Sequence, residues 1–218
     1  GTMIRTFAPL SLLVLAAAAN AADIKFFGAD MTFTRDVRIS YLGQNSHVYA
    51  GPLKVAVDGG SQFSAYCVDL AHSISSGDQW SVTVTSTSDP SLNNGVRLGQ
   101  IYNKYAGSVS SKDEGAALQL ALWDVWADGG DGFSSGAFRA TSISASVTAL
   151  FSAIVADPLT GISSFTNYYK ADFHGPNNDR NQNLIGGTPP NATPVPEPAS
   201  MAVIGLGLAA LRRRRAVK

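Results

Sequence analysis

The segment SKDEGAALQLALWDVWA, residues 111–127, carries the strongest structural signal in the chain and predicts a single helix. Ser111 followed by Glu114 three residues later is the capping-box pattern of a helix N-terminus. The pair Gly129-Gly130 then ends the run, because glycine is the usual residue just after the last helical turn. The prediction is therefore a helix from about Ser111 to Ala127.

An amide interrupts the apolar face of this helix. The stripe at helical spacing consists of Ala116, Gln119, Leu122, Trp123 and Trp126. A buried amide without partners costs about 1–3 kcal/mol. Gln119 therefore needs either ordinary hydrogen bonds or a reaction in which its amide nitrogen is lost.

Strand-like segments lie on both sides of this helix in the sequence. Alternation of apolar and polar residues and turn composition predict short strands within 24–41, a hairpin of 53–57 and 63–70 joined by the turn 58–61, and a strand at 80–85. Apolar residues at helical spacing predict helices at 98–105 and 143–156, and a last strand is predicted at 165–173. The fold class predicted is α+β: a β-sandwich or barrel with an inserted helical subdomain that carries Gln119.

Cys67 is the single cysteine of the chain and lies in the predicted strand 63–70. Alternation along a strand places Cys67 on the same face as Asp69. Cysteines of exported proteins normally occur in pairs. A lone one is therefore either a small buried apolar residue or a group kept for a reaction.

Export is predicted from the N-terminal residues. Arg5 precedes an apolar stretch that ends in Ala19-Asn20-Ala21, the small-x-small pattern of signal-peptidase cleavage. We expect residues 1–21 to be a signal peptide, with two residues preceding Met3. The alternative, a membrane anchor, is disfavoured because the apolar run is shorter than the ~20 residues of a spanning helix.

The C-terminal residues combine three features of a sorting signal. Pro196-Glu197-Pro198 leads into the apolar residues 201–211, and four arginines, 212–215, follow. An apolar segment closed by arginines is typical of a stop-transfer helix with its basic end in the cytoplasm. We therefore expect a short transmembrane helix; a tail anchor that is never processed is the alternative.

This order of features resembles the PEP-CTERM sorting signal of bacteria with an outer membrane, over residues 195–218. The resemblance implies recognition by an exosortase, transient anchoring in the inner membrane, removal of the tail, and a final place at the cell surface or in the extracellular matrix, commonly alongside exopolysaccharide in a biofilm. Residues 175–194, rich in Asn, Gly and Pro, are predicted to be a flexible linker before the signal.

The charge of the predicted mature body differs from that of the whole chain. Both charge types number sixteen overall, but Arg5, Lys218 and the four tail arginines lie outside residues 22–190, as does Glu197. Ten basic and fifteen acidic side chains remain. A mildly acidic body of this length fits one domain and argues against nucleic acid as the partner.

Two short motifs in the body resemble the Cys-Gln thioester domain of bacterial surface adhesins. They are Tyr66-Cys67-Val68-Asp69 and, about fifty residues later, Leu118-Gln119-Leu120-Ala121-Leu122-Trp123. The resemblance spans about residues 24–173, so we assign 22–174 to a thioester-like domain. It implies a bond between Cys67 and Gln119 that captures an amine of a surface partner, such as a lysine. It also implies a binding module without a cofactor, not an enzyme.

Three neighbours of the predicted bond are candidates for supporting roles. Tyr66 and Trp123 adjoin the reacting groups and could shield a thioester from water. Asp69 could orient a reacting group or remove a proton from it. The rival hypothesis is a non-covalent component of the exopolysaccharide or biofilm matrix, in which Cys67 and Gln119 only pack.

The residue types present also bear on two other kinds of site. A cysteine hydrolase needs a histidine beside Cys67, but His47, His72 and His174 are scattered in loop-like settings, typical of surface residues. Asp124, Asp128 and Asp131 could form a calcium loop, yet they lack the order of an EF-hand. A capped helix end followed by a turn is favoured, so we predict no metal site.

Overall fold

The structure, a computed structural model, describes residues 20–172 and 181–188. Its elements, in chain order, are β1 (Asn20–Ala29), β2 (Arg35–Tyr41), β3 (Gln44–Ala50), β4 (Leu53–Val57), β5 (Phe63–Cys67), β6 (Gln79–Ser86), α1 (Gly95–Tyr105), the 3-10 turn η1 (Ala106–Ser108), α2 (Lys112–Asp128), β7 (Phe138–Thr141), α3 (Ala145–Ala156), β8 (Asn167–Ala171) and β9 (Leu184–Gly186).

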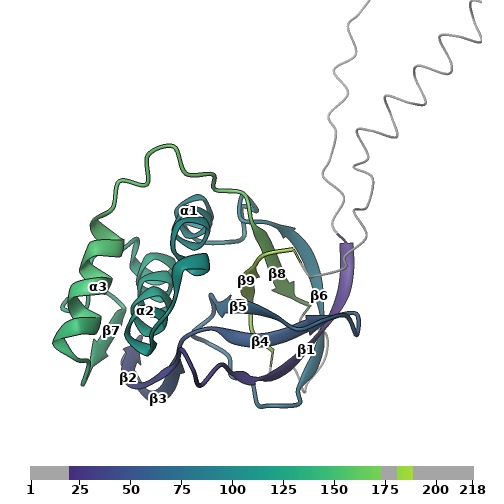
Figure 1. Cartoon of the computed structure of the whole chain (residues 1–218), viewed down its shortest axis with the longest axis horizontal. Helices are drawn as coiled ribbons and strands as arrows, with labels where there is room; N and C mark the ends of the chain where they lie inside the picture. The colour runs from purple at the N-terminus through teal and green to yellow at the C-terminus, as the bar shows by residue number, and fades with distance from the viewer. Residues whose placement is uncertain (1–19, 173–180, 189–218) are drawn as a thin grey trace, which may run out of the picture. The chain divides into compact units, whose positions relative to one another are not determined.

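Six strands close into a barrel in the order β1-β4-β5-β9-β8-β6. The helices α1, α2 and α3 follow β6 and precede β8, and they lie together on one side of the barrel (Figure 1). The predicted barrel with a helical insertion is confirmed in this coarse form. The sandwich alternative is wrong, because the strand pairing closes on itself and leaves a single barrel wall.

Strand β1 illustrates how the sequence builds the barrel wall. Ile24 and Phe26 are buried, whereas Lys25 and Phe27 between and after them are exposed. Successive side chains of a strand point to opposite faces, so this alternation separates a barrel interior from a solvent face. The interior also receives Val55 from β4.

The predicted hairpin of β4 and β5 is present, with Leu53 opposite Ala65 and Val55 opposite Phe63. Strand β5 ends at Cys67, however, and not at residue 70 as predicted. The chain turns there, because the Asp69 N–H donates to the Cys67 sulfur. A backbone group that bonds a side chain two residues away is not available to a strand ladder.

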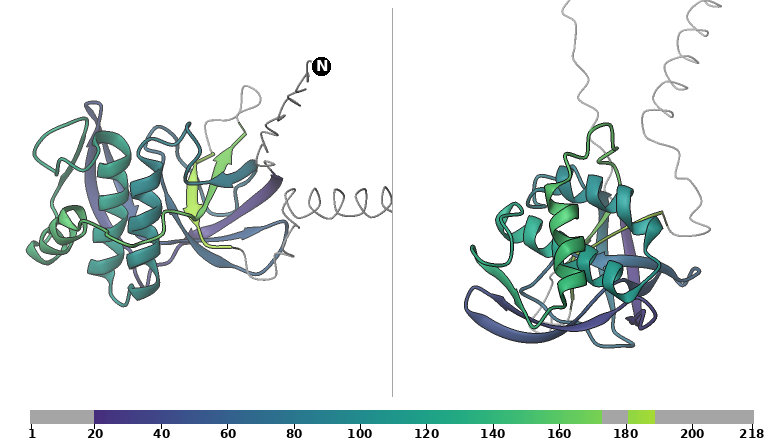
Figure 2. Two further views of the ribbon diagram at one scale, coloured as in Figure 1. Left: turned by 90° about the horizontal axis from the view of Figure 1, so that it is seen from above. Right: turned by 60° about the vertical axis from the view of Figure 1, so that its left-hand side comes forward.

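A second sheet, of order β3-β2-β7, lies beside the helices (Figure 2). Its hairpin closes through Leu42 and Gly43, with φ of 49° and 81°. Two consecutive left-handed residues make the tight turn that matches the twist of paired strands. The sequence did not predict β3, because most of its side chains are polar and exposed, nor β7, which has four residues.

Helix α2 is the centre of the insertion. The predicted capping box of Ser111 and Glu114 is present, and Gly129 ends the helix with φ of 76°. Every residue from Gly115 to Val125 is buried, because α2 packs against α1 and α3 as well as against β2, β3, β5 and β7. The predicted one-sided apolar stripe therefore underestimates its burial, since a helix surrounded by neighbours is apolar on all sides.

The other two helices also match their predictions. Leu98 and Ile101 of α1 are fully buried, and α3 begins at the cap residue Ser144, whose hydroxyl accepts from Val147 N–H. Figure 2 shows α1 and α2 side by side. The predicted last strand is β8, shorter at both ends than residues 165–173.

Strand β9 corrects one prediction. It lies within residues 175–194, which were predicted to be a flexible linker, yet it pairs with both β5 and β8 and so closes the barrel. Leu184 and Ile185 are fully buried. Three residues are too short a run to show alternation against a background of Asn and Gly, which is why composition alone mislabelled them.

The predicted export segments lie almost wholly outside the described residues. Of the predicted signal peptide only Asn20 and Ala21 are described, and both belong to β1, opposite Val84 and Thr83 of β6. No helix within residues 20–172 and 181–188 has the length and apolar character to cross a membrane. The predicted tail helix at 201–211 falls beyond these ranges.

Candidate functional site

Cys67 and Gln119 meet in the core, although 52 residues separate them in the chain. Cys67 is the last residue of β5, and Gln119 lies in the middle of α2. The Cys67 N–H donates to Gln119 Oε1 at 3.2 Å, and Gln119 Nε2 donates to the Cys67 carbonyl at 2.8 Å. The side-chain amide thus pairs with both backbone groups of Cys67 as a neighbouring strand would.

Neither residue is open to solvent. Cys67 is 3% exposed and Gln119 is 1% exposed. The two hydrogen bonds satisfy an amide whose burial would otherwise cost about 1–3 kcal/mol. They also hold the Gln119 amide against the residue that carries the sulfur.

The sulfur of Cys67 is held by the main chain of Asp69. It donates to the Asp69 carbonyl at 2.9 Å and accepts from the Asp69 N–H at 3.3 Å. Burial, with a smaller contribution from the charge of Asp69, raises the pKa of the Cys67 thiol to about 12. The reduced thiol is therefore neutral at physiological pH.

Trp123, one turn after Gln119 on α2, opposes this shift, as does the hydrogen bond from the Asp69 main chain. Its indole N–H approaches the sulfur and holds the pKa of the thiol below the value that burial alone would produce. The same N–H has no acceptor in full hydrogen-bond geometry, although Trp123 is 5% exposed. A buried donor without a full partner lies next to the sulfur, where a negative charge would complete its hydrogen bond.

Asp69 and His72 form a pair beside the sulfur. His72 Nδ1 lies 2.8 Å and 3.0 Å from the two carboxylate oxygens of Asp69. Asp69 is buried, and its carboxylate also accepts from the Ala71 N–H at 2.9 Å. Gln182, just before β9, donates to the main-chain carbonyl of His72. The loop after β5 is thus held by hydrogen bonds within the loop and by a hydrogen bond from Gln182.

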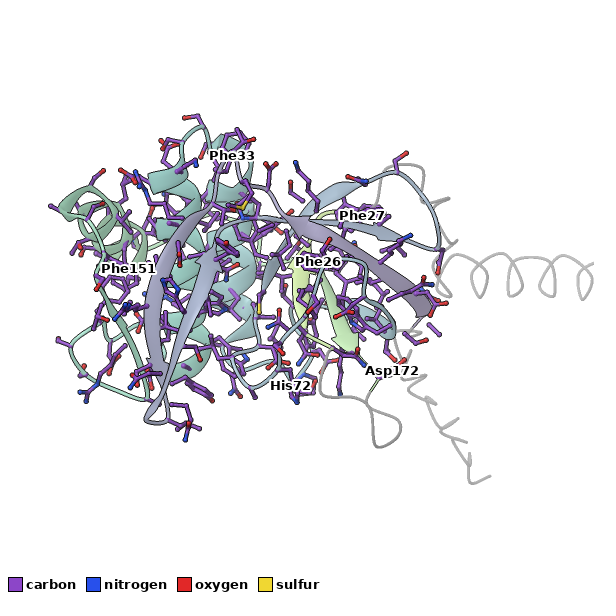
Figure 3. All side chains as sticks on the ribbon, turned by 90° about the horizontal axis from the view of Figure 1, so that it is seen from below. Phe26, Phe27, Phe33, His72, Phe151 and Asp172 are labelled. Carbon is purple, nitrogen blue, oxygen red and sulfur yellow. The ribbon has the colours of Figure 1, made fainter. Side chains whose placement is uncertain are left out.

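A cleft of about 730 Å³ reaches this site. Cys67, Gln119 and Trp123 line it together with Asp69 and His72. Other walls come from β1, β3 and the loop after β5, and Figure 3 labels two of the lining residues, Phe26 and His72. The buried pair therefore lies at the wall of a hollow large enough for a small ligand or an extended side chain.

Tyr66 has a different environment from the one expected. It is 2% exposed and its ring packs edge-on against Tyr102 of α1, with centroids 6.1 Å apart. Tyr66 does not line the cleft, because adjacent strand residues point to opposite faces. Of the two aromatic residues predicted as a shield, the fold brings only Trp123 to the cleft.

The histidines are predicted to be surface residues, and His72 departs from this. It is half-buried and bound to Asp69, whereas His47 is exposed and pairs with Asp36 at 2.8 Å. His174 lies outside the described residues. The i, i+3 spacing of Asp69 and His72 was the available signal, but such spacing has no meaning in a strand, which residues 63–70 were predicted to form.

Comparison with known proteins adds three findings. Residues 194–216 match the PEP-CTERM protein-sorting motif, and no curated protein matches the chain. Among solved structures, one match is the "N-terminal thioester domain of fibronectin-binding protein SfbI from Streptococcus pyogenes". It is 13% identical, with a TM-score of 0.41, and the match covers 76% of this chain and 98% of that one.

The sorting motif accounts for the tail features that the sequence predicts, including Pro196-Glu197-Pro198. Such a motif implies processing by an exosortase. The chain therefore carries a PEP-CTERM sorting signal, which marks it as an exported surface protein of a Gram-negative bacterium.

Proposed function

We propose that this protein is a surface module that captures an amine of a partner covalently, through an internal thioester between Cys67 and Gln119. The observation that carries the proposal is the double hydrogen bond between the Gln119 amide and the Cys67 backbone, at the wall of a cleft. The sorting signal supports a surface role.

The bond would form by loss of ammonia. The Cys67 sulfur attacks the Gln119 side-chain carbonyl carbon, the carbon–nitrogen bond breaks, and the thiol proton leaves with the nitrogen as ammonia. Burial of both residues supports the survival of the product, because water excluded from a site cannot hydrolyse a reactive acyl group.

Capture would be the reverse exchange with a new nitrogen. A primary amine that enters the cleft attacks the same carbonyl carbon, an amide forms, and the carbon–sulfur bond breaks to leave Cys67 as a thiol. The attacking amine loses one proton, and His72, held by Asp69 and lining the same cleft, is the group we assign to accept it and pass it to the departing Cys67 sulfur. The product stays attached to Gln119, so the protein acts once and does not turn over.

Methylamine tests this function directly. After incubation of the full chain with methylamine, we expect peptide mass spectrometry to find methylamine attached at Gln119 and a free thiol at Cys67. Cys67→Ala should show no attachment, because nothing activates the carbonyl. Unmodified Gln119 in the wild-type chain would refute the proposal, provided that circular dichroism shows the protein folded.

Trp123→Phe should slow the capture step. Burial makes the Cys67 thiolate a poor leaving group, and the indole N–H is a side-chain donor placed to stabilise it. A hydrogen bond to a charged group contributes about 1.5–3 kcal/mol, so its loss predicts methylamine incorporation roughly 10- to 100-fold slower. The rate is measured by intact mass against time.

Trp126→Phe is the matched control for this prediction. Trp126 lies on the same helix, is half-buried and packs on Tyr41, with ring centroids 5.6 Å apart. It should react at the wild-type rate. If Trp123→Phe reacts as fast as Trp126→Phe, the indole of Trp123 has no role in the capture step.

The alternative, a non-covalent matrix component, has one observation in its favour. The Gln119 amide already has a donor and an acceptor in Cys67, so it is stable in the core without any reaction. In that case Gln119 would be a structural link between α2 and the barrel, and methylamine would leave it unchanged.

A further inference from the structure

We infer that Asp124, Asp128 and Asp131 form a binding site for a calcium ion at the C-terminal end of α2. This site is separate from the proposed thioester and does not depend on it. The spacing of these aspartates in the sequence favours a simple turn, but three features of their tertiary environment point to a cation.

The first feature is the distance between the carboxylates. One oxygen from each of the three side chains lies within 4.8 Å of those from the other two. Calcium binds oxygen ligands at about 2.3–2.6 Å, so two oxygens on one ion are at most about 5 Å apart. The separations of the three carboxylates are therefore within the range spanned by oxygens that share a single ion.

The second feature is a buried oxygen without a partner. Asp124 is fully buried, and its Oδ2 accepts from the Gly132 N–H at 3.1 Å. Its Oδ1 has no hydrogen-bond partner. A buried carboxylate oxygen normally has a donor or a metal ion, because leaving it unsatisfied costs free energy.

The third feature is the local charge. The three acids lie at the negative end of the α2 dipole, and the last turn of α2 has no basic residue. No ion pair within residues 20–172 and 181–188 includes any of the three. The nearby Arg97 instead donates to the main-chain carbonyls of Gly129 and Val155.

The other contacts of the cluster leave room for an ion. Asp128 accepts from the Ala137 and Phe138 N–H groups at 2.9 and 2.7 Å, and Asp131 accepts from the Ser135 hydroxyl at 3.0 Å. A carboxylate oxygen has two lone pairs and can accept a hydrogen bond while it binds a metal. Water would complete the six to eight ligands of calcium.

Calcium binding is tested on the full chain, purified in chelator. At constant ionic strength, isothermal titration with CaCl2 should give a one-site isotherm, with Kd on the order of 10⁻³ M or below, as in extracellular calcium modules. Calcium at ten times this Kd should raise Tm by roughly 3–6 °C. Magnesium at the same concentration should do less, because its octahedral shell requires shorter metal–oxygen distances.

Asp124→Asn and Asp131→Asn should each abolish the heat of binding and the rise in Tm. Asp36→Asn removes an exposed acid outside the cluster and should keep the full response, which controls for net charge. Asp131 is at the surface, where its side chain accepts from the Ser135 hydroxyl, so its variant remains informative if Asp124→Asn fails to fold. Absence of calcium binding by the wild-type chain, or its survival in Asp131→Asn, would overturn the inference.

Discussion

Purified at mild pH in a buffer free of amines, the full chain is expected to weigh one ammonia less than its sequence requires. This mass corresponds to the Gln119 amide nitrogen with its two hydrogens together with the thiol hydrogen of Cys67. Cys67→Ala should restore the full mass for its own sequence. Gln119→Leu should also show no deficit and should keep a free thiol at Cys67.

The thiol has to be counted after unfolding. Burial raises the pKa of the Cys67 thiol to about 12, and the thiolate is the form that reacts with thiol reagents. A native chain without a thioester would therefore react slowly with a thiol reagent, just as a chain with a thioester would. The intact mass separates the two cases, because a silent thiol has the full mass and a thioester does not.

The result decides between the two candidate functions. A deficit in the wild-type chain that is absent from Cys67→Ala would establish the thioester and direct the search to amine-bearing partners. The full mass, in a folded wild-type chain, would contradict the thioester and leave an exported domain in which Gln119 only packs.

Gly115→Ala is expected to destabilise the protein and to disturb the Cys67–Gln119 pair. A Cβ at Gly115 would lie 2.0 Å from the Phe33 carbonyl oxygen, which is backbone and cannot rotate away. Figure 3 labels Phe33 near the helices. Alanine normally favours a helix over glycine by about 1 kcal/mol. Here the overlap should reverse the sign, with a net loss of about 1–3 kcal/mol.

The effect should extend to the site because of helix geometry. Gln119 lies one turn beyond Gly115, on the same face of α2. Moving α2 away from Phe33 would lengthen the hydrogen bonds that hold Gln119 to Cys67. We therefore expect a lower Tm and a smaller fraction of chains with the ammonia deficit.

Gly107→Ala is the control for this variant. No heavy atom lies within 4 Å of the position that its Cβ would occupy, so Tm should stay within about 2 °C of the wild-type value. A Gly115→Ala chain with unchanged Tm and an undiminished deficit would contradict the tight approach of Phe33 to α2.

The elements that the sequence predicted best are those whose signals are local. The capping box of Ser111 and Glu114 and the stop at Gly129 are read within a few residues, and α2 has these ends. The hairpin of β4 and β5 is likewise encoded by alternation around a turn. Strand β9 was missed, because it is held only by partners far away in the chain, β5 and β8.

The candidate site also has features that the sequence predicts and features that only the tertiary structure shows. Cys67 and Gln119 could be chosen from sequence because a lone cysteine and an amide on an apolar face are both unusual. Their hydrogen bonds depend on the packing of α2 against β5. The approach of the Trp123 indole to the sulfur also depends on that packing.

The amino-acid sequence was sufficient for the helices, the main hairpin and the sorting signal, because capping, periodicity and motif order act over short stretches. The folded chain was needed to learn that the sheet closes as a barrel, that His72 faces Asp69, and that Asp124 keeps a buried oxygen without a donor. Closure, burial and hydrogen-bond satisfaction depend on residues brought together from distant parts of the chain, and no local pattern encodes those distances.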